Sequence, residues 1–304
     1  MNEELLEVLR PGAFAIAYRM LGSVTEAEDV VQEALLRVHR ALSDGERIES
    51  PRAFAATVTT RLAIDELRSA RARRELYVGE WLPEPILTDG TDDPARHAEM
   101  ADSLSMAMLV LLERLSPEQR AVLLLRDVFD YSYGEISAIV GKTEDNVRQL
   151  AARARRQVEA GRPRFEVSDQ QRLDFARRFV AAAREGELSA LEALLAEDVV
   201  LTGDGGGKVP ALARSITGRE RVGRTLRNWI ALGPRIPGAS MQPAAVNGGP
   251  GVLLLDGEQR VIAVWAFELV AGEIKRINSI VNPAKLGHLG AVSDLGTVLA
   301  RRSS

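Results

Sequence analysis

Polar side chains that can contact DNA recur along residues 143–158. Arginine binds guanine edges or phosphates, and asparagine and glutamine bind adenine edges. Between Asn146 and Arg156 the sequence has four arginines and no acid, so a helix formed here would carry a cationic surface. The candidate DNA contacts face away from the apolar stripe of that helix and are Asn146, Arg148, Gln149, Arg153 and Arg156.

Two short helices joined by a glycine turn are expected to position these side chains. Ser132 and Glu135 form a capping box that starts the first helix, and Gly141 ends it. Thr143 caps the second helix, whose apolar stripe consists of Val147, Leu150, Ala151, Ala154 and Val158. This pattern predicts a helix-turn-helix. A solvated basic helical hairpin is the alternative interpretation, but the caps, the turn and the polar face together favour DNA binding.

A second cationic helix is predicted nearer the N-terminus. Ser50 is placed to cap it, and Pro51 takes its first helical position. Residues 52–74 contain six arginines and two acids, so their outer face should attract phosphates. The candidate DNA contacts on this helix are Arg52, Arg61, Arg68, Arg71 and Arg73.

The helix before it presents acids and amides instead. Thr25 and Glu28 form a capping box that predicts where this helix starts. Opposite its apolar stripe lie Asp29, Gln32 and Glu33. Taken alone, such a face is interpreted as solvated surface.

Composition and charge narrow the class of protein. A chain of 304 residues is long enough for two or three domains. Its net charge of −4 would argue against a nucleic-acid partner. The arginines are clustered, however, so the local charge of each patch determines whether that patch can bind nucleic acid. Without cysteines, and with three histidines far apart, neither a metal site nor a cofactor is expected. No apolar stretch is long enough to span a membrane and no secretory signal is evident, so a cytoplasmic location without a membrane partner is expected.

The chain changes character after a linker at residues 163–167. A helix capped by Ser168 and Gln171 should end near Gly186, and a shorter helix should follow at residues 188–195. The remaining segments are rich in β-forming residues, and Ala271 and Gly272 mark a hairpin. Strands are predicted at Val199–Leu201, Gly251–Leu255, Arg260–Val270 and Glu273–Val281. Helices followed by strands indicate an α+β domain.

The helical parts resemble bacterial sigma factors of the extracytoplasmic-function type. AEDVVQEALLRVHR and PRAFAATVTTRLAIDELRSARARRE are similar to region two, and LLERLSPEQRAVLLLRDVFDYSY with the helix-turn-helix is similar to region four. The resemblance implies that Asp29, Gln32 and Glu33 dock on the β′ clamp helices of core RNA polymerase. It also implies that the arginine-rich helix holds the minus-ten promoter element and that the helix-turn-helix reads the minus-thirty-five element.

The C-terminal part resembles the SnoaL-like members of the NTF2-like fold. WLPEP, DGGGK and NPAKL occur in this order at 81–85, 204–208 and 282–286. They are similar to motifs of a sigma-factor subgroup in which a fused SnoaL-like domain regulates the sigma factor in place of a separate anti-sigma factor. The implied regulatory contacts are Trp81, Pro83, Asp204, Gly206, Lys208, Asn282 and Pro283.

The expected architecture is multidomain, with two all-α domains followed by an α+β, NTF2-like cone that has a curved antiparallel sheet. The expected divisions are region two at 1–76, a linker with WLPEP at 77–103, region four at 104–162, a linker at 163–167, the SnoaL-like domain at 168–290 and a flexible tail at 291–304.

The expected function is promoter-specific transcription initiation, regulated by the C-terminal domain and without enzymatic activity. Two alternatives remain open: a helix-turn-helix transcription regulator that acts without sigma activity, and a SnoaL-like enzyme with a DNA-binding appendage. The cone could also hold a small-molecule ligand.

Overall fold

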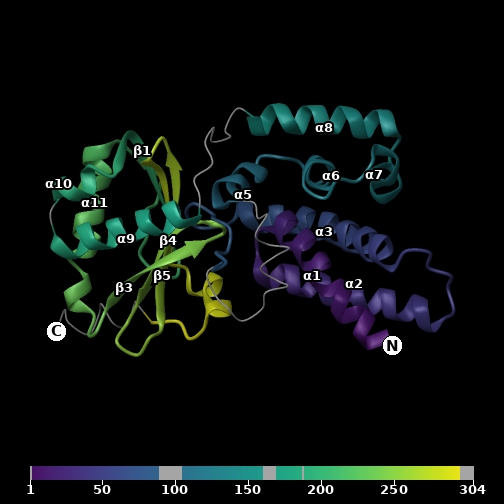
Figure 1. Ribbon diagram of the computed structural model, residues 1–304, viewed down its shortest axis with the longest axis horizontal. Coiled ribbons are helices and arrows are strands. Elements are labelled where there is room, and N and C mark those ends of the chain that lie inside the picture. Colours follow the sequence, from purple (N-terminus) through teal and green to yellow (C-terminus); the bar gives the residue numbers. More distant parts are fainter. Residues whose placement is uncertain (1, 89–104, 160–168, 187, 295–304) are drawn as a thin grey trace. The chain divides into compact units, whose positions relative to one another are not determined.

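The computed structural model describes residues 2–88, 105–159, 169–186 and 188–294, which form two compact units (Figure 1). The helical unit contains residues 2–75 and 108–159, and the α+β unit contains residues 76–88, residues 105–107 and every described residue after 168. Several predicted features lie outside the described residues: the linker at 163–167, the second part of the linker at 77–103, the cap at Ser168 and the tail from 295 onward.

Three long helices form the first part of the helical unit: α1 (Asn2–Leu21), α2 (Val24–Ser43) and α3 (Pro51–Glu75). The predicted capping box at Thr25 is wrong, because the cap of α2 is Ser23, whose hydroxyl accepts the Glu26 N–H at 3.2 Å. Gly22 has φ +67°, which ends α1 and leaves Ser23 extended before the next helix. The cap at Ser50 is confirmed, since its hydroxyl accepts the Ala53 N–H at 3.3 Å.

The second part consists of α5 (Met106–Leu112), α6 (Pro117–Asp127), α7 (Tyr133–Val140) and α8 (Glu144–Glu159). The capping box of Ser132 and Glu135 is present, and Gly141 ends α7 with φ +66°. The predicted helix-turn-helix is therefore confirmed. Its core contains Val122, Leu125, Ile136, Ile139, Val147 and Ala151.

The α+β unit begins with two helices and continues into a sheet with one further helix. Its elements are α9 (Asp169–Glu185), α10 (Leu188–Glu192), β1 (Leu195–Asp204), β2 (Ile216–Thr217), α11 (Arg219–Ile230), β3 (Ser240–Val246), β4 (Gly249–Leu255), β5 (Val261–Val270) and β6 (Glu273–Ile280). The α+β class and the hairpin at Ala271 and Gly272 are confirmed. The sequence did not reveal α11, β2 or β3.

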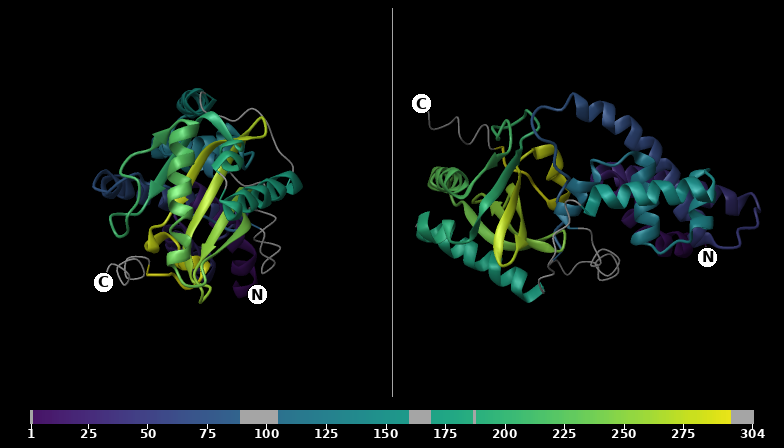
Figure 2. Two further views of the ribbon diagram at one scale, coloured as in Figure 1. Left: turned by 90° about the vertical axis from the view of Figure 1, so that its left-hand side faces the viewer. Right: turned by 90° about the horizontal axis from the view of Figure 1, so that it is seen from above.

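The sheet has the strand order β2-β1-β6-β5-β4-β3, and Figure 2 shows its twist from two further directions. Neighbouring strands are antiparallel except for β1 and β6, which are parallel, so the sheet is mixed rather than wholly antiparallel. Helix α9 packs Phe179 against Trp265 and Phe267 of β5, with ring centroids 6.1 and 4.7 Å apart. These aromatic side chains fill the core beneath α9.

Candidate nucleic-acid interface and the buried strap

The predicted DNA contacts of α8 lie on its solvent side. Val147, Ala151, Ala154 and Val158 are buried against the rest of the helix-turn-helix. This packing leaves the opposite side of the helix open, because residues on one face recur every three or four positions. The exposed residues there include all five candidates, Asn146, Arg148, Gln149, Arg153 and Arg156.

The arginines of α3 make a different set of contacts within the helical unit. Arg61 donates to the carbonyl oxygens of Ala138 and Ile139 at 2.9 Å each, at the end of α7. Arg68 lies 2.5 Å from Glu118 of α6, and the hydrogen bond to Glu118 raises the pKa of Arg68. Groups that could bind phosphates are thus occupied here by carbonyl and carboxylate oxygens.

Two further candidates on α3 are also held by oxygen atoms of the helical unit. Arg71 donates to the carbonyl oxygen of Leu115. Arg73 bonds to Glu66 at 2.6 Å and to Glu26 at 2.7 Å, and these bonds raise its pKa. Both arginines therefore connect α3 to neighbouring parts of the unit, and Arg73 remains exposed.

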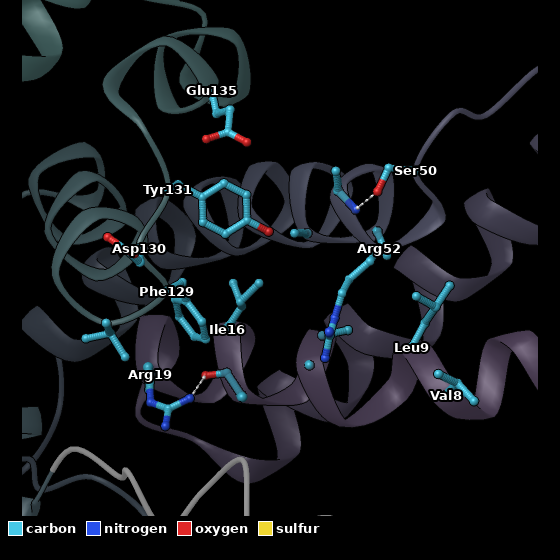
Figure 3. A pocket seen from close by; sticks show the side chains of 17 residues that line it. Val8, Leu9, Ile16, Arg19, Ser50, Arg52, Phe129, Asp130, Tyr131 and Glu135 are labelled. Carbon is cyan, nitrogen blue, oxygen red and sulfur yellow. Dashed lines mark hydrogen bonds between the residues drawn. The ribbon is translucent and has the colours of Figure 1, made fainter.

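The remaining candidate on α3, Arg52, lines a pocket of about 600 Å³ in the helical unit (Figure 3). The pocket lies between α1, the start of α3 and residues 128–135. Phe129 and Tyr131 reach it from the segment before α7, and the Arg19 guanidinium lies 5.2 Å from the Phe129 ring centroid. The start of α3 thus faces aromatic side chains from the segment between α6 and α7.

The candidate polymerase contacts lie together on α2. Asp29 and Gln32 are exposed, and Glu33 is partly exposed and pairs with Arg37 at 2.7 Å. Leu36, one turn further along, is an exposed large apolar residue. An acidic face with an apolar neighbour is thus available to a partner.

In the α+β unit, residues 76–88 form a segment that we call the strap. Its backbone runs along the end of β3: Thr88 N–H donates to the Ala245 carbonyl at 2.9 Å, and Asn247 N–H donates to the Ile86 carbonyl at 2.8 Å. The WLPEP residues Leu82 to Pro85 are buried in the unit. The strap therefore behaves as an additional edge segment of the sheet.

Asp204, the last residue of β1, is the centre of the strap contact and is fully buried. Its carboxylate accepts hydrogen bonds from the Tyr77 hydroxyl, from the Leu82 N–H at 2.8 Å and from Lys285 at 2.7 Å. Burial and the bond to Asp204 raise the pKa of Tyr77, so its hydroxyl stays protonated and donates. Two donors from the strap thus reach one buried carboxylate.

The segment after β6 completes this contact. Asn282 donates to the Tyr77 hydroxyl at 2.7 Å, and Pro283 begins a short 3₁₀ turn that carries Lys285. Lys285 also donates to the Leu82 carbonyl, and its ammonium lies 4.0 Å from the Trp81 ring centroid. The hydrogen-bond acceptors and the aromatic face around the Lys285 ammonium offset the free-energy cost of burying its charge.

Comparisons with known proteins identify the family. Residues 5–73 match the family described as Sigma-70 region 2, and residues 105–158 match Sigma-70, region 4. The ECF RNA polymerase sigma factor SigJ of Mycobacterium tuberculosis is 38% identical over 296 residues, which cover 94% of this chain and 93% of SigJ. The chain belongs to the extracytoplasmic-function sigma factors. It functions as an RNA polymerase sigma factor, a class that binds core polymerase and promoter DNA.

One further relative and one solved structure show how far the similarity to other sigma factors extends. The ECF sigma factor SigG of Mycobacterium tuberculosis is 32% identical over 218 residues, or 64% of this chain and 59% of SigG. The crystal structure of Mycobacterium tuberculosis SigJ superposes with a TM-score of 0.75 at 33% identity and covers 93% of this sigma factor and 98% of that chain. The expected combination of region two, region four and a C-terminal α+β domain is therefore confirmed.

Three residues of the strap contact in this sigma factor were not identified from the sequence: Tyr77, Leu82 and Lys285. Leu82 and Lys285 lie within WLPEP and NPAKL, so the motifs indicated the segments but not these two residues. Lys208 of DGGGK, which the resemblance implied as a contact, is exposed, whereas Lys285 is the lysine that reaches Asp204. Gly206 lies against the strap, since a Cβ on it would come within 3.0 Å of the Tyr77 hydroxyl.

The described part of this sigma factor has neither a membrane-spanning helix nor a cluster of metal-binding side chains. No described helix has the length and apolar character needed to cross a bilayer. Within residues 2–88, 105–159, 169–186 and 188–294, no three histidine, aspartate or glutamate side chains are grouped so that they could bind a metal ion.

Proposed function

We propose that the α+β unit regulates this sigma factor by holding the strap. The strap follows directly after α3, the last helix of region two, and precedes region four in the chain. Whatever fixes the strap therefore limits the conformations that region two and region four can adopt on one promoter. The observation that carries this proposal is the buried Asp204 carboxylate, which accepts donors from Tyr77 and Leu82 of the strap.

The energetics favour a positional role for this contact. Burying an ion pair contributes little net stability, because desolvation offsets the attraction of the two charges. Removing one partner is costly, since it leaves the other charge buried. The Asp204–Lys285 pair, with side chains 0% and 7% exposed, therefore specifies where the strap lies more than it strengthens the unit.

In this proposal the fused α+β unit takes the place of a separate anti-sigma factor. A tethered regulator acts at an effective concentration that does not depend on its own expression. A small molecule that binds this unit would act by loosening or tightening the strap. Because aromatic side chains fill the core beneath α9, such a ligand would enter elsewhere in the cone.

The remaining parts of the proposal assign the contacts with polymerase and DNA. Asp29, Gln32 and Glu33 dock on the β′ clamp helices, supported by their shared exposed face on α2. Region two holds the minus-ten element through the arginines of α3, and region four reads the minus-thirty-five element through the exposed face of α8. The α3 arginines must exchange their present carbonyl and carboxylate partners for phosphates when DNA binds.

Run-off transcription with purified core polymerase tests the regulatory proposal. Lys285→Met and Asp204→Asn should both change the amount of promoter-dependent transcript, because both release the strap. Lys208→Met changes an exposed lysine of the same region and is the matched control. Unchanged transcription by both strap variants would contradict regulation through the strap. A chain that needs no core polymerase to act would instead be a transcription regulator without sigma activity.

A further inference from the structure

Tyr133, the first residue of α7, lies at the centre of a group of arginines on one edge of region four. The guanidinium carbon of Arg148 lies 4.5 Å from the centroid of its ring, and that of Arg126 lies 5.2 Å away. Cations within about 6 Å of an aromatic face are attracted to it. The ring also packs against the core of the helix-turn-helix, so its position is fixed. One aromatic side chain thus brings arginines from α6 and α8 together.

Neighbouring contacts fix the other arginines of this edge. Arg126 donates to the Tyr131 carbonyl at 2.8 Å. Arg155 bonds to Asp127 through Nε at 2.9 Å. The hydrogen bond to Asp127 is the main cause of the raised pKa of Arg155, and Tyr133 contributes to it. Arg148 is the arginine of this group whose side chain remains most exposed, at 55%.

The position of Arg148 on α8 indicates which part of DNA it meets. Arg148 and Arg155 are seven residues apart, about two turns, and so lie along the same edge. Asn146 and Arg153 are also seven residues apart but lie on the side away from the buried stripe. In a helix-turn-helix the recognition helix enters the major groove while the first helix crosses the backbone. In that docking geometry the edge of α8 beside Tyr133 of α7 would face the DNA backbone.

We propose that Arg148, held by the Tyr133 ring beside Arg126, binds a backbone phosphate of the minus-thirty-five element. Base edges are then read by the outer face of α8, which carries Asn146, Gln149 and Arg153. Tyr133 is a positioning residue in this arrangement. The assignment rests on the proposed function of α8 as the helix that contacts promoter DNA.

Glu144 explains how Arg148 is kept in place before DNA binds. Its carboxylate accepts a hydrogen bond from Arg148 at 3.1 Å, and the two side chains are 51% and 55% exposed. Room for Glu144 comes from Gly134, since a Cβ there would lie 3.1 Å from the carboxylate. Exposed ion pairs of this kind are weak, so a phosphate can displace Glu144.

The test measures binding of the full chain with core polymerase to promoter DNA, over a series of salt concentrations and a panel of base substitutions in the minus-thirty-five element. Arg148→Gln should weaken binding to every sequence by the same factor and reduce the slope of log K against log salt by about 0.9. Asn146→Ala should relax the preference at one base pair and leave the slope unchanged. If Arg148→Gln instead removes the preference at one base pair with an unchanged slope, the phosphate assignment is overturned.

The role of Tyr133 is tested with two substitutions. Tyr133→Phe keeps the ring and should match the parent protein, whereas Tyr133→Leu should reproduce the smaller salt slope of Arg148→Gln. Thermal unfolding of each variant shows whether region four remains folded. If Tyr133→Leu reduces the slope further when Arg148 is already Gln, Tyr133 does not act through Arg148. If substitutions at Asn146, Arg148 and Arg153 all leave binding unchanged, α8 does not contact the promoter and the proposed function itself fails.

Discussion

The Lys285 ammonium lies 2.7 Å from the Asp204 carboxylate, although 81 positions separate the two residues in the chain. Both groups are buried, and both also bond to the backbone of Leu82 in the strap. The ion pair and the strap therefore form one contact, so removing either charge should weaken the hydrogen bonds at the Leu82 backbone.

Substitution of Lys285 should release the strap. Lys285→Met leaves Asp204 buried without its cation, and the expected loss of stability in the α+β unit is about 3–5 kcal/mol. Hydrogen exchange at the Leu82 amide, which bonds to Asp204, should become faster. Lys208→Met should alter stability by about 0.5 kcal/mol or less, because that lysine is exposed. Equal exchange rates in the two variants would argue against the ion pair as the anchor of the strap.

A methyl group at position 206 should disturb the same contact from the other side. In Gly206→Ala the new Cβ would lie 2.2 Å from Asn282 Nδ2, and the residue has φ +59°. Asn282 and Tyr77 must move, and we expect a cost of about 1–3 kcal/mol. Gly45→Ala is the matched control, since Gly45 has φ +77° with no atom within 4 Å of the added Cβ. Urea unfolding of both variants separates backbone strain from displacement of the strap.

Arg120 should be the most sensitive arginine of the helical unit. It is 1% exposed and donates to the Met20 carbonyl at 2.7 Å and to Glu113 at 2.8 Å, which connects α6 to α1. Arg120→Met should destabilise the helical unit by about 2–4 kcal/mol, because these acceptors lose their donor. Arg114→Met, at an exposed position, should have little effect on thermal unfolding. Similar melting of the two variants would show that Arg120 does not hold α6 in place.

Asp256 should make the stability of the α+β unit depend on acid pH. Burial raises its pKa, but hydrogen bonds from Arg260 and from backbone N–H groups outweigh this effect and hold the pKa at about 2. This value is below the usual 3.9 of an unfolded chain, so the stabilisation is present above about pH 4 and lost as the pH falls toward 2. Asp256→Asn should cost about 1–3 kcal/mol at pH ~7. The cost should shrink near pH ~2, and urea unfolding at both pH values measures it.

The features that the sequence predicted well are local. A capping box such as Ser132 with Glu135 links side chains and backbone within three residues, so the pattern contains the whole interaction. Gly141 and Gly186 end their helices with positive φ, a backbone conformation that glycine adopts readily, so residue type alone predicted these two helix ends. The Thr25 and Glu28 pattern fits a capping box, but Ser23 also has a side chain that can cap, and the turn at Gly22 places Ser23 at the start of α2.

The features that were missed depend on tertiary contacts. Lys208 lies within DGGGK and Lys285 within NPAKL, and nothing in the two motifs shows which lysine the fold buries. β3 contains Met241 and Pro243 and lacks the alternation typical of a strand, yet it pairs with β4 over seven residues. α11 carries Val222 and Leu226 at helical spacing, so its amphipathic pattern could have been found.

The parallel pairing of β1 with β6 determines whether DGGGK and NPAKL can meet. Asp204 ends β1 opposite Ile280, the last residue of β6. Both motifs therefore begin where these two strands end, on the same side of the sheet. Had β6 run in the opposite direction, the two motifs would have been separated by the full length of a strand, about 25 Å for eight residues. Strand direction, rather than the motifs themselves, makes them a single binding surface for the strap.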